Sequence, residues 1–347
     1  MKIAIITDTH YGCRRSSKVF HDYFQKFYDD IFFPELEKRG IKECIHMGDA
    51  FDNRKSIDFW ALDWARRNVY DKFRDLGVKV WQLAGNHDTY FKNTNEVNSI
   101  DSLLKDYTNV IPISSPDEYD INGFKAFMIP WICDDNIDET KKKIEKTPTN
   151  VAFGHLEITG FQLYPGCIQQ TGIDKGFFNK FEFVFSGHYH TRSNDGQIYY
   201  LGNPYQMYWN DAGDIRGFNI FDTETYEMEF IPNPYTMFEK VYYEDTPAEL
   251  FKSHLYENKI VKLIVRKKTD QKKFDKFVDK LLKSKAVDIK ITESLEVNDS
   301  EVDFAGEKIE DTLTLLNKYI EDSDFDLKKN RVKDLLREVY LEACEME

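Results

Sequence analysis

Polar side chains that can bind metal ions follow several short apolar runs of this sequence. Asp8 and His10 come directly after the run Ile3 to Ile6, where a turn would need only a glycine or an asparagine. Carboxylate, amide and imidazole groups are common ligands of divalent metal ions in proteins. Residues of this kind recur at the ends of later apolar runs. The full set is Asp8, His10, Asp49, Asn86, His87, His155, His188 and His190. We therefore expect one shared site, built from residues far apart in the chain.

Such a site needs a fold that brings the ends of separate strands together. The first 230 residues alternate short apolar runs with helical patterns, which is typical of a layered α/β fold, where ligands bind at the carboxyl ends of the strands. The predicted strands are KIAIIT, ECIHMG, KVWQLAG, KAFMIPW, NVAFGH, FEFVFSGHYH, QIYYLGN and GFNIFD. In this assignment His188 and His190 share one face of a strand. Ser56 to Leu76 and Val19 to Phe32 keep helical spacing, and Pro34 is expected to break or kink the second helix.

A pair of divalent ions would organise the two acids, one amide and five imidazoles expected at this edge. The mixed nitrogen and oxygen ligands suit Mn²⁺, with Mg²⁺, Fe²⁺ and Zn²⁺ as alternatives. Two such ions can clamp a phosphodiester and stabilise charge on both the attacking and the leaving oxygen. Each motif is weak by itself, because strand-end turns and single buried histidines are common. Their combination, in order after successive strands, indicates a site for a pair of divalent ions.

Composition leaves the partner open. The 347 residues carry a formal net charge of −14, yet between Lys262 and Lys285 ten basic residues stand against three acidic ones, a balance of +7. A basic segment can neutralise nucleic-acid phosphates, although most charged helices are simply solvated. Five scattered cysteines without a CxxC pair argue against a disulfide framework and a thiolate zinc site. With no signal-peptide pattern and no membrane-length apolar run, we expect a cytoplasmic protein that does not enter a membrane.

A smaller module is predicted after Pro232 to Pro234. Two strands, KVYYE and KIVKLIV, precede a basic helix over residues 271–284 and a further strand, VDIKITE. From about residue 300 the chain is charged and helical, and its apolar stripes can be covered by a partner or by the chain's own surface. The predicted divisions are 1–235, 236–295 and 296–347.

The motifs DTH, GDAFD, GNHD, GH at residues 154–155 and GHYH resemble those of the calcineurin-like metallophosphoesterase superfamily. GDAFD and GNHD resemble in particular the SbcD-type, or meiotic-recombination-eleven, DNA-repair nucleases. IPWICDDN, GHLEITGF and RGFNIFDTET are similar to segments of the recombination nuclease subunits of T-even-like bacteriophages. The resemblance implies a four-layer fold of two mixed sheets sandwiched by helices, with a small α+β capping domain and C-terminal helices. If the protein is viral, the resemblance also implies that it is located in the cytoplasm of the host cell.

The resemblance further implies a role for each residue of the site. Asp49 would bridge two Mn²⁺ ions per chain, with Mg²⁺ as a possible substitute. The other ligands would be Asp8, His10 and His190 for one ion and Asn86, His155 and His188 for the second. His87 would be the catalytic histidine. Asp52 would orient it, or else cap the helix that follows.

By the same resemblance, the chain would be a homodimeric nuclease subunit of a DNA double-strand-break repair and recombination complex. It would act as a 3′ to 5′ exonuclease and a single-strand endonuclease, together with an SbcC-type coiled-coil ATPase. DNA would be bound by Lys267, Lys268, Lys272 and Lys273, and the ATPase by Val332, Leu335, Leu336 and Val339. Four aromatic residues can either stack on an unpaired base or pack in the core: Tyr164, Tyr205, Tyr208 and Trp209. The alternatives are a small-molecule phosphodiesterase, a protein phosphatase of the same superfamily, or a non-catalytic DNA-binding scaffold.

Overall fold

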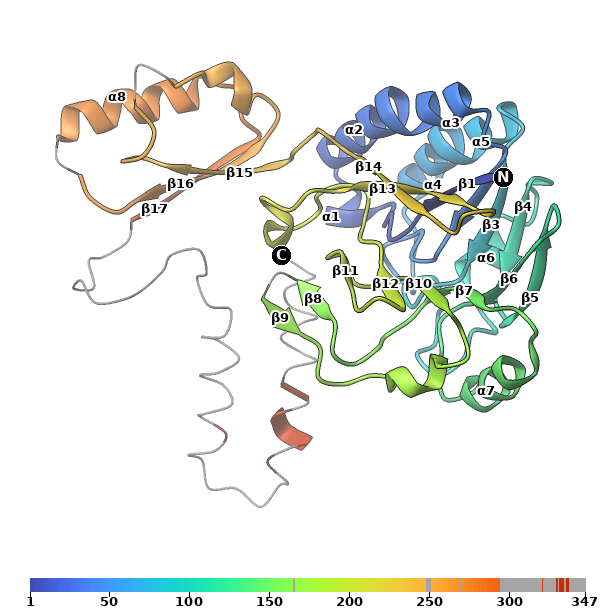
Figure 1. Ribbon diagram of the computed structural model, residues 1–347. Helices are drawn as coiled ribbons and strands as arrows, with labels where there is room; N and C mark the ends of the chain where they lie inside the picture. Colours follow the sequence, from blue (N-terminus) through green and yellow to red (C-terminus); the bar gives the residue numbers. More distant parts are fainter. Residues whose placement is uncertain are drawn as a thin grey trace.

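The computed structural model describes residues 1–164, 166–247, 251–268 and 270–293, together with residues 320, 329, 331–333, 335 and 336. Its main body contains two six-stranded mixed sheets, with helices on their outer faces (Figure 1). This confirms the predicted fold class of two mixed sheets between helices. Among the described residues, no helix combines the length and the apolar character that a membrane crossing demands.

The first sheet has the order β14-β13-β1-β2-β3-β4. Its strands are β14 (Met228–Pro232), β13 (Gly217–Asp222), β1 (Lys2–Ile6), β2 (Glu43–His46), β3 (Lys79–Leu83) and β4 (Val110–Ile113). The strands from β1 to β4 are parallel, whereas β13 and β14 are antiparallel to their neighbours. The carboxyl ends of β1, β2 and β3 therefore meet at one edge, as the sequence predicts.

The second sheet has the order β11-β12-β10-β7-β6-β5. Its strands are β11 (Ser193–Asn194), β12 (Ile198–Tyr200), β10 (Phe183–Gly187), β7 (Val151–His155), β6 (Phe124–Ile129) and β5 (Asp117–Ile121). Because β10 ends at Gly187, the prediction that His188 and His190 share one face of a strand is wrong. The backbone turns at His188, whose φ is +82°, and both histidines lie in the loop that follows.

Two long helical stretches cover the first sheet. They consist of α2 (Lys18–Phe27) and α3 (Phe33–Arg39), joined by a π-helical turn at Tyr28–Phe32, and of α4 (Phe59–Ala65) and α5 (Asp71–Asp75), joined by another at Arg66–Tyr70. Pro34 does not end the first stretch. The Phe33 N–H bonds the Tyr28 carbonyl five residues back, and Pro34 lies in the first turn of α3, where a missing N–H is tolerated.

Shorter elements complete the main body. They are α1 (Cys13–Ser16), α6 (Ser99–Leu103), α7 (Ile137–Lys146), the two-stranded sheet of β8 (Gln162–Tyr164) and β9 (Cys167–Ile168), and 3₁₀ turns at Lys175–Phe178 and Trp209–Asp211. Ile144 of α7 packs against the outer face of the second sheet. Between the sheets, Ile5 and Met47 of the first meet Phe153 and Phe185 of the second. This buried layer fixes the position of one sheet against the other and therefore of the two sets of strand ends.

A small parallel sheet follows the main body and lies to one side of it in Figure 1. It contains β15 (Phe238–Tyr242), β16 (Ile260–Val265) and β17 (Asp288–Glu293), with a 3₁₀ turn at Ser253–Tyr256 before β16 and α8 (Gln271–Leu282) between β16 and β17. Its apolar core includes Leu263 and Phe277, and Phe238 packs on Trp209 of the main body. The division near residue 235 stays a prediction. Most of the expected region 296–347 lies outside the described residues.

Candidate metal centre

Potential metal ligands from both sheets meet at the carboxyl ends of β1, β2, β3, β7 and β10. In each of three overlapping groups, the candidate ligand atoms lie within 4.8 Å of one another. The groups are Asp8, His10 and His190; His10, Asp49 and His87; and Asp49, His155 and His188. The structure thus brings together side chains from residues as far apart in sequence as Asp8 and His190.

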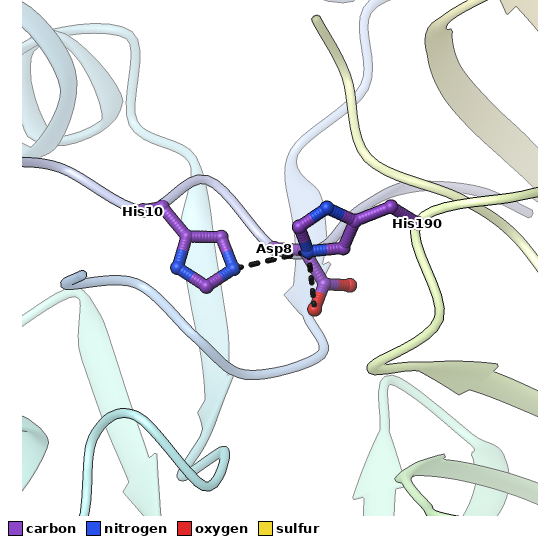
Figure 2. Close-up of side chains that lie close together, drawn as sticks. All are labelled: Asp8, His10 and His190. Atoms are coloured by element: carbon purple, nitrogen blue, oxygen red, sulfur yellow. Dashed lines mark hydrogen bonds and ion pairs between the residues drawn. The ribbon is translucent and has the colours of Figure 1, made fainter. Parts of the chain in front are cut away.

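The first group has two imidazole nitrogens in direct contact. Figure 2 shows His10 and His190 beside Asp8, with 3.2 Å between their Nε2 atoms and 4.0 Å from His190 Nε2 to Asp8 Oδ1. At this distance only one proton fits between the two Nε2 atoms, so at least one of these nitrogens carries no proton. A cation placed between them and the carboxylate would satisfy both lone pairs at once.

Asp49 lies between the first and the last group. Its Oδ2 is 3.8 Å from His10 Nε2 and 3.2 Å from His155 Nε2. Asn86 Oδ1 is 2.9 Å from His155 Nε2 and also 2.9 Å from His188 Nδ1. Buried carboxylate, amide and imidazole groups in this arrangement fit a pair of divalent ions that share Asp49.

The backbone is strained at four of these residues. Asp8, His10, Asp49 and His188 have φ values of +51°, +43°, +52° and +82°, in the left-handed region. For residues other than glycine this costs roughly 1–2 kcal/mol each. Backbone hydrogen bonds between the loop after β1 and the loop after β2 stabilise this strained conformation. The Asp8 N–H donates to Gly48 O at 3.0 Å, and the His10 N–H donates to Asp49 O at 3.1 Å. Strain of this kind gathers at functional sites.

Two glycines allow the loops to approach this closely. A β-carbon at Gly85 would overlap the Asp49 carboxylate and backbone, and one at Gly187 would overlap the Thr7 hydroxyl and come close to Asp8. Any larger side chain would therefore push the ligands apart.

The pKa values of the two buried carboxylates are shifted in opposite directions. Burial raises the pKa of Asp8, and the charge of Asp49 adds to this effect. For Asp49, burial also acts to raise the pKa, but the charges of His155 and His87 outweigh it and hold the pKa well below its ordinary value. In return, Asp49 overcomes the effect of burial on His155 and raises its pKa to about 9. Asp49 is thus the anionic centre of the site.

The imidazoles divide into two kinds. Burial acts to lower the pKa of His10, but Asp52 and Asp49 outweigh it and raise that pKa to about 9. His188 and His190 have pKa values well below the ordinary value, because they are buried beside other histidines. His188 and His190 are therefore neutral and able to bind a cation, while binding at His10 would release a proton.

His87 lies beside this cluster and is fixed at two points. Its backbone N–H donates to Asp49 Oδ1 at 2.8 Å, and its ring Nδ1–H donates to the backbone carbonyl of Asp52 at 2.6 Å. The ring is edge-on to that of His10, with 4.8 Å between centroids. Since Nδ1 is engaged, Nε2 is the nitrogen that a substrate can reach.

Asp52 therefore holds His87 through its carbonyl group and not through its carboxylate. The carboxylate Oδ1 lies 3.3 Å from His10 Nδ1, at ion-pair distance but without the alignment of a hydrogen bond. The alternative, that Asp52 caps the next helix, is wrong. Asp58 caps α4 by accepting the Trp60 N–H at 2.8 Å.

Known proteins share this sequence pattern. The profile of the family described as calcineurin-like phosphoesterase matches residues 1–192. The chain belongs to this family. It is also 32% identical, over 324 residues and 92% of each chain, to "Exonuclease subunit 1" of Enterobacteria phage T4. The expected family is thereby confirmed, and with it a hydrolase of phosphoesters.

Two solved structures show weaker similarity to this phosphoesterase. One is a novel archaeal phosphodiesterase, with 16% identity and a TM-score of 0.35, covering 67% of this chain and all of the other. The other is the purple acid phosphatase PPD1 from seeds of yellow lupin (Lupinus luteus), with 13% identity and a TM-score of 0.34, covering 55% of this chain and 38% of the other.

Asp88 supports the phosphoesterase site and was missed by the sequence reasoning. Its buried carboxylate accepts N–H bonds from Gly85 at 2.9 Å, Ala50 at 3.1 Å and Phe51 at 3.3 Å, and the Ser99 hydroxyl at 3.2 Å. It thus ties the loop after β2 to the loop after β3. The only signal in the sequence was its place at the end of the GNHD motif.

Arg216 is a second supporting residue that the sequence reasoning missed. Its Nη1 donates to the backbone carbonyl of His190, and its Nη2 lies 2.9 Å from Asp211. This buried ion pair fixes the loop that carries His190. The residue stands 26 positions after that histidine, and no spacing in the sequence connects the two.

Aromatic rings flank the cluster on two sides. The Trp131 ring lies 5.2 Å from that of His188, and the Tyr208 ring is nearly parallel to that of His190 at 6.3 Å. Of the two alternatives for Tyr205, the structure shows core packing, because Tyr205 is buried and stacks on Phe24 at 3.8 Å. Because its ring is packed in the core, a substrate cannot contact it.

The expected DNA and partner residues lie elsewhere. Lys267 and Lys268 come just before α8, and Lys272 and Lys273 belong to its first turn, so all four lie on the small module. Val332, Leu335 and Leu336 are described as helical, with Leu335 exposed, whereas Val339 lies outside the described residues. Their assigned roles stay predictions.

Proposed function

We propose that this phosphoesterase is a two-metal DNA nuclease, the nuclease subunit of a double-strand-break repair and recombination complex. One observation carries the proposal: the Asp49 carboxylate lies between two groups of ligands, 3.8 Å from His10 and 3.2 Å from His155. A shared carboxylate is what a two-metal site requires. The similarity to a phage exonuclease subunit favours exonuclease activity. DNA as the substrate, with 3′ to 5′ exonuclease and single-strand endonuclease activity, is proposed from the resemblance of the motifs to those of SbcD-type nucleases.

Seven residues would hold the two ions. The expected ion at both positions is Mn²⁺, and Mg²⁺ is a possible substitute. Asp8, His10 and His190 would hold one, Asn86, His155 and His188 the other, and Asp49 both. When bound, two divalent ions supply positive charge that neutralises the phosphodiester and favours attack by water.

His87 would supply the proton or hydrogen bond that the leaving oxygen needs. The Asp52 carbonyl fixes the proton on Nδ1, and the bond from the His87 backbone to Asp49 sets the ring beside the ligand cluster. General acid catalysis by a positioned histidine contributes a factor of roughly 10² to 10⁴. A scaffold that only binds DNA has no use for this arrangement.

The substrate can be tested directly. Purified protein is incubated with Mn²⁺ or EDTA and offered end-labelled linear DNA and, in parallel, bis(p-nitrophenyl) phosphate. A DNA nuclease shortens the DNA only with the metal, and the label shows from which end. Hydrolysis of the small ester alone would support the small-molecule phosphodiesterase instead, and loss of neither substrate would support the scaffold.

Partners form the second part of the proposal. We propose that Val332, Leu335, Leu336 and Val339 bind a coiled-coil ATPase, since an apolar helical stripe is a common way to bind a partner. Removal of residues 296–347 should leave a folded nuclease that no longer co-purifies with the ATPase. A truncated chain that loses solubility and metal would show instead that this region belongs to the protein's own core.

A homodimer is proposed as well. Phe59 and Trp60, at the start of α4, expose 90% and 40% of their surface, and large exposed apolar side chains often mark an interface. We also propose that the protein acts in the cytoplasm, which for a viral protein is the cytoplasm of the host cell. DNA as the substrate and four free cysteines among the described residues favour this location.

A further inference from the structure

The short element α1 (Cys13–Ser16), which follows His10, does not have the backbone angles of an ordinary α-helix. Arg14, Arg15 and Ser16 have φ values of +54°, +57° and +56°, so three consecutive residues other than glycine are left-handed. Each such residue costs roughly 1–2 kcal/mol, and left-handed residues normally occur singly. A run of three must be enforced by its surroundings, and it marks a segment whose side chains are held in one place.

His21 enforces this turn. The Gly12 N–H donates to His21 Nε2 at 3.1 Å, and His21 Nδ1–H donates to the Ser17 carbonyl at 2.8 Å. The imidazole is fully buried, with the rings of Trp60 and Trp64 each 4.9 Å away. Both ends of the left-handed turn are therefore bonded to one rigid side chain.

The turn presents Arg14 at the rim of the metal centre. Its guanidinium carbon lies 5.4 Å from the centre of the Tyr208 ring and 5.6 Å from that of Phe20. Tyr208 in turn lies against His190, so two ring contacts separate this cation from a proposed ligand. Among the described residues, the Arg14 guanidinium makes no hydrogen bond and no ion pair.

A half-buried guanidinium of this kind is suited to an anionic ligand. Contacts with two rings restrict its position, while its N–H groups have no acceptor in the described protein. The planar fork of donors matches a phosphate group. On the basis of the proposed function, we propose that Arg14 binds a phosphate of the DNA strand next to the phosphate that is cleaved.

This role separates long substrates from short ones. A polynucleotide carries further phosphates on either side of the cleaved bond, whereas bis(p-nitrophenyl) phosphate carries only the one that enters the metal centre. Arg14 should therefore contribute to the KM for DNA and contribute nothing to hydrolysis of the small ester.

The test compares Arg14→Ala and Arg14→Lys with the control Lys18→Ala. Lys18 also carries one positive charge, four residues further on, but its ammonium group pairs with Asp22 at 2.7 Å. Binding of a fluorescein-labelled single-stranded oligonucleotide is measured by anisotropy in EDTA, without metal. KM and kcat for the oligonucleotide and for bis(p-nitrophenyl) phosphate are then measured with Mn²⁺.

We expect Arg14→Ala to weaken oligonucleotide binding about tenfold, the loss typical of one charge-assisted contact. The KM for the oligonucleotide should rise by a similar factor, with kcat and hydrolysis of the small ester unchanged. Arg14→Lys, which keeps the charge but not the fork, should lie between Arg14→Ala and the wild type, and Lys18→Ala should match the wild type.

Three results would overturn the assignment: unchanged oligonucleotide binding in Arg14→Ala, an equal loss in Lys18→Ala, or a parallel loss with the small ester, which would indicate a structural role. Failure of the nuclease proposal looks different. The wild type would then hydrolyse the small ester and leave DNA intact, and the binding measured in EDTA would still decide whether Arg14 holds a phosphate.

Discussion

Replacing Asp88 with asparagine tests whether one buried carboxylate sets the spacing between the two central loops. Oδ2 accepts the Gly85 N–H at 2.9 Å, and Oδ1 accepts from Ala50 and Phe51 at 3.1 and 3.3 Å. An asparagine presents an NH₂ group on one side, so at least one backbone donor would face another donor. Buried hydrogen bonds to a charged group are worth about 1.5–3 kcal/mol each.

We therefore expect Asp88→Asn to lower the free energy of unfolding by about 2–4 kcal/mol. The corresponding fall in Tm is about 3–5 °C for a chain of 347 residues, because the entropy of unfolding grows with chain length. Asp49 and Asn86 lie on the two loops that Asp88 connects, so the affinity for Mn²⁺ should fall as well. If the displacement of these ligands costs about 1.4 kcal/mol of binding free energy, the affinity falls about tenfold. Thermal melts with and without Mn²⁺ and calorimetric titration of the ion measure both effects.

Asp58→Asn is the matched control, since Asp58 caps α4 at the surface and asparagine caps a helix equally well. It should melt and bind metal like the wild type. If Asp88→Asn does the same, the two loops are held by other contacts and the reasoning is wrong. A loss of Tm with unchanged metal affinity would show that Asp88 stabilises the fold without positioning the ligands.

Other predictions concern the metal centre, the proposed dimer and the basic segment of the small module. Asp49→Ala should abolish binding of both ions, seen as loss of metal in purified, Mn²⁺-loaded protein; more than one ion retained per chain would contradict a shared carboxylate. His87→Gln should keep both ions and lower kcat by roughly 10² to 10⁴, whereas His188→Ala should weaken metal binding; identical metal titrations for the two would refute the role of His87. Phe59→Asp should convert a dimer to a monomer in light scattering, and a wild-type monomer would rule the dimer out. Glutamate substitutions in the basic segment should weaken binding to every DNA sequence alike and make the binding less dependent on salt. The residues to be replaced are Lys267, Lys268, Lys272 and Lys273.

The sequence by itself determined the fold class and the candidate metal ligands that gather at the ends of the strands. Alternating apolar runs and helical patterns indicate burial, so the strands that end before Asp8 and Asp49 and the strand that ends at His155 could be predicted without a structure. The types of residue at those ends also limited the chemistry, because carboxylate, amide and imidazole groups together favour divalent ions. These inferences need only local pattern and side-chain chemistry.

The tertiary structure alone decided which atoms face one another. Turn geometry points the Asp52 carbonyl toward His87 and its carboxylate toward His10, a distinction that residue type cannot show. Asp88 and Arg14 have their significance only because folding places backbone donors around one and aromatic rings beside the other. Such contacts join residues far apart in the chain and depend on backbone angles that single residues adopt only under the constraint of the whole fold.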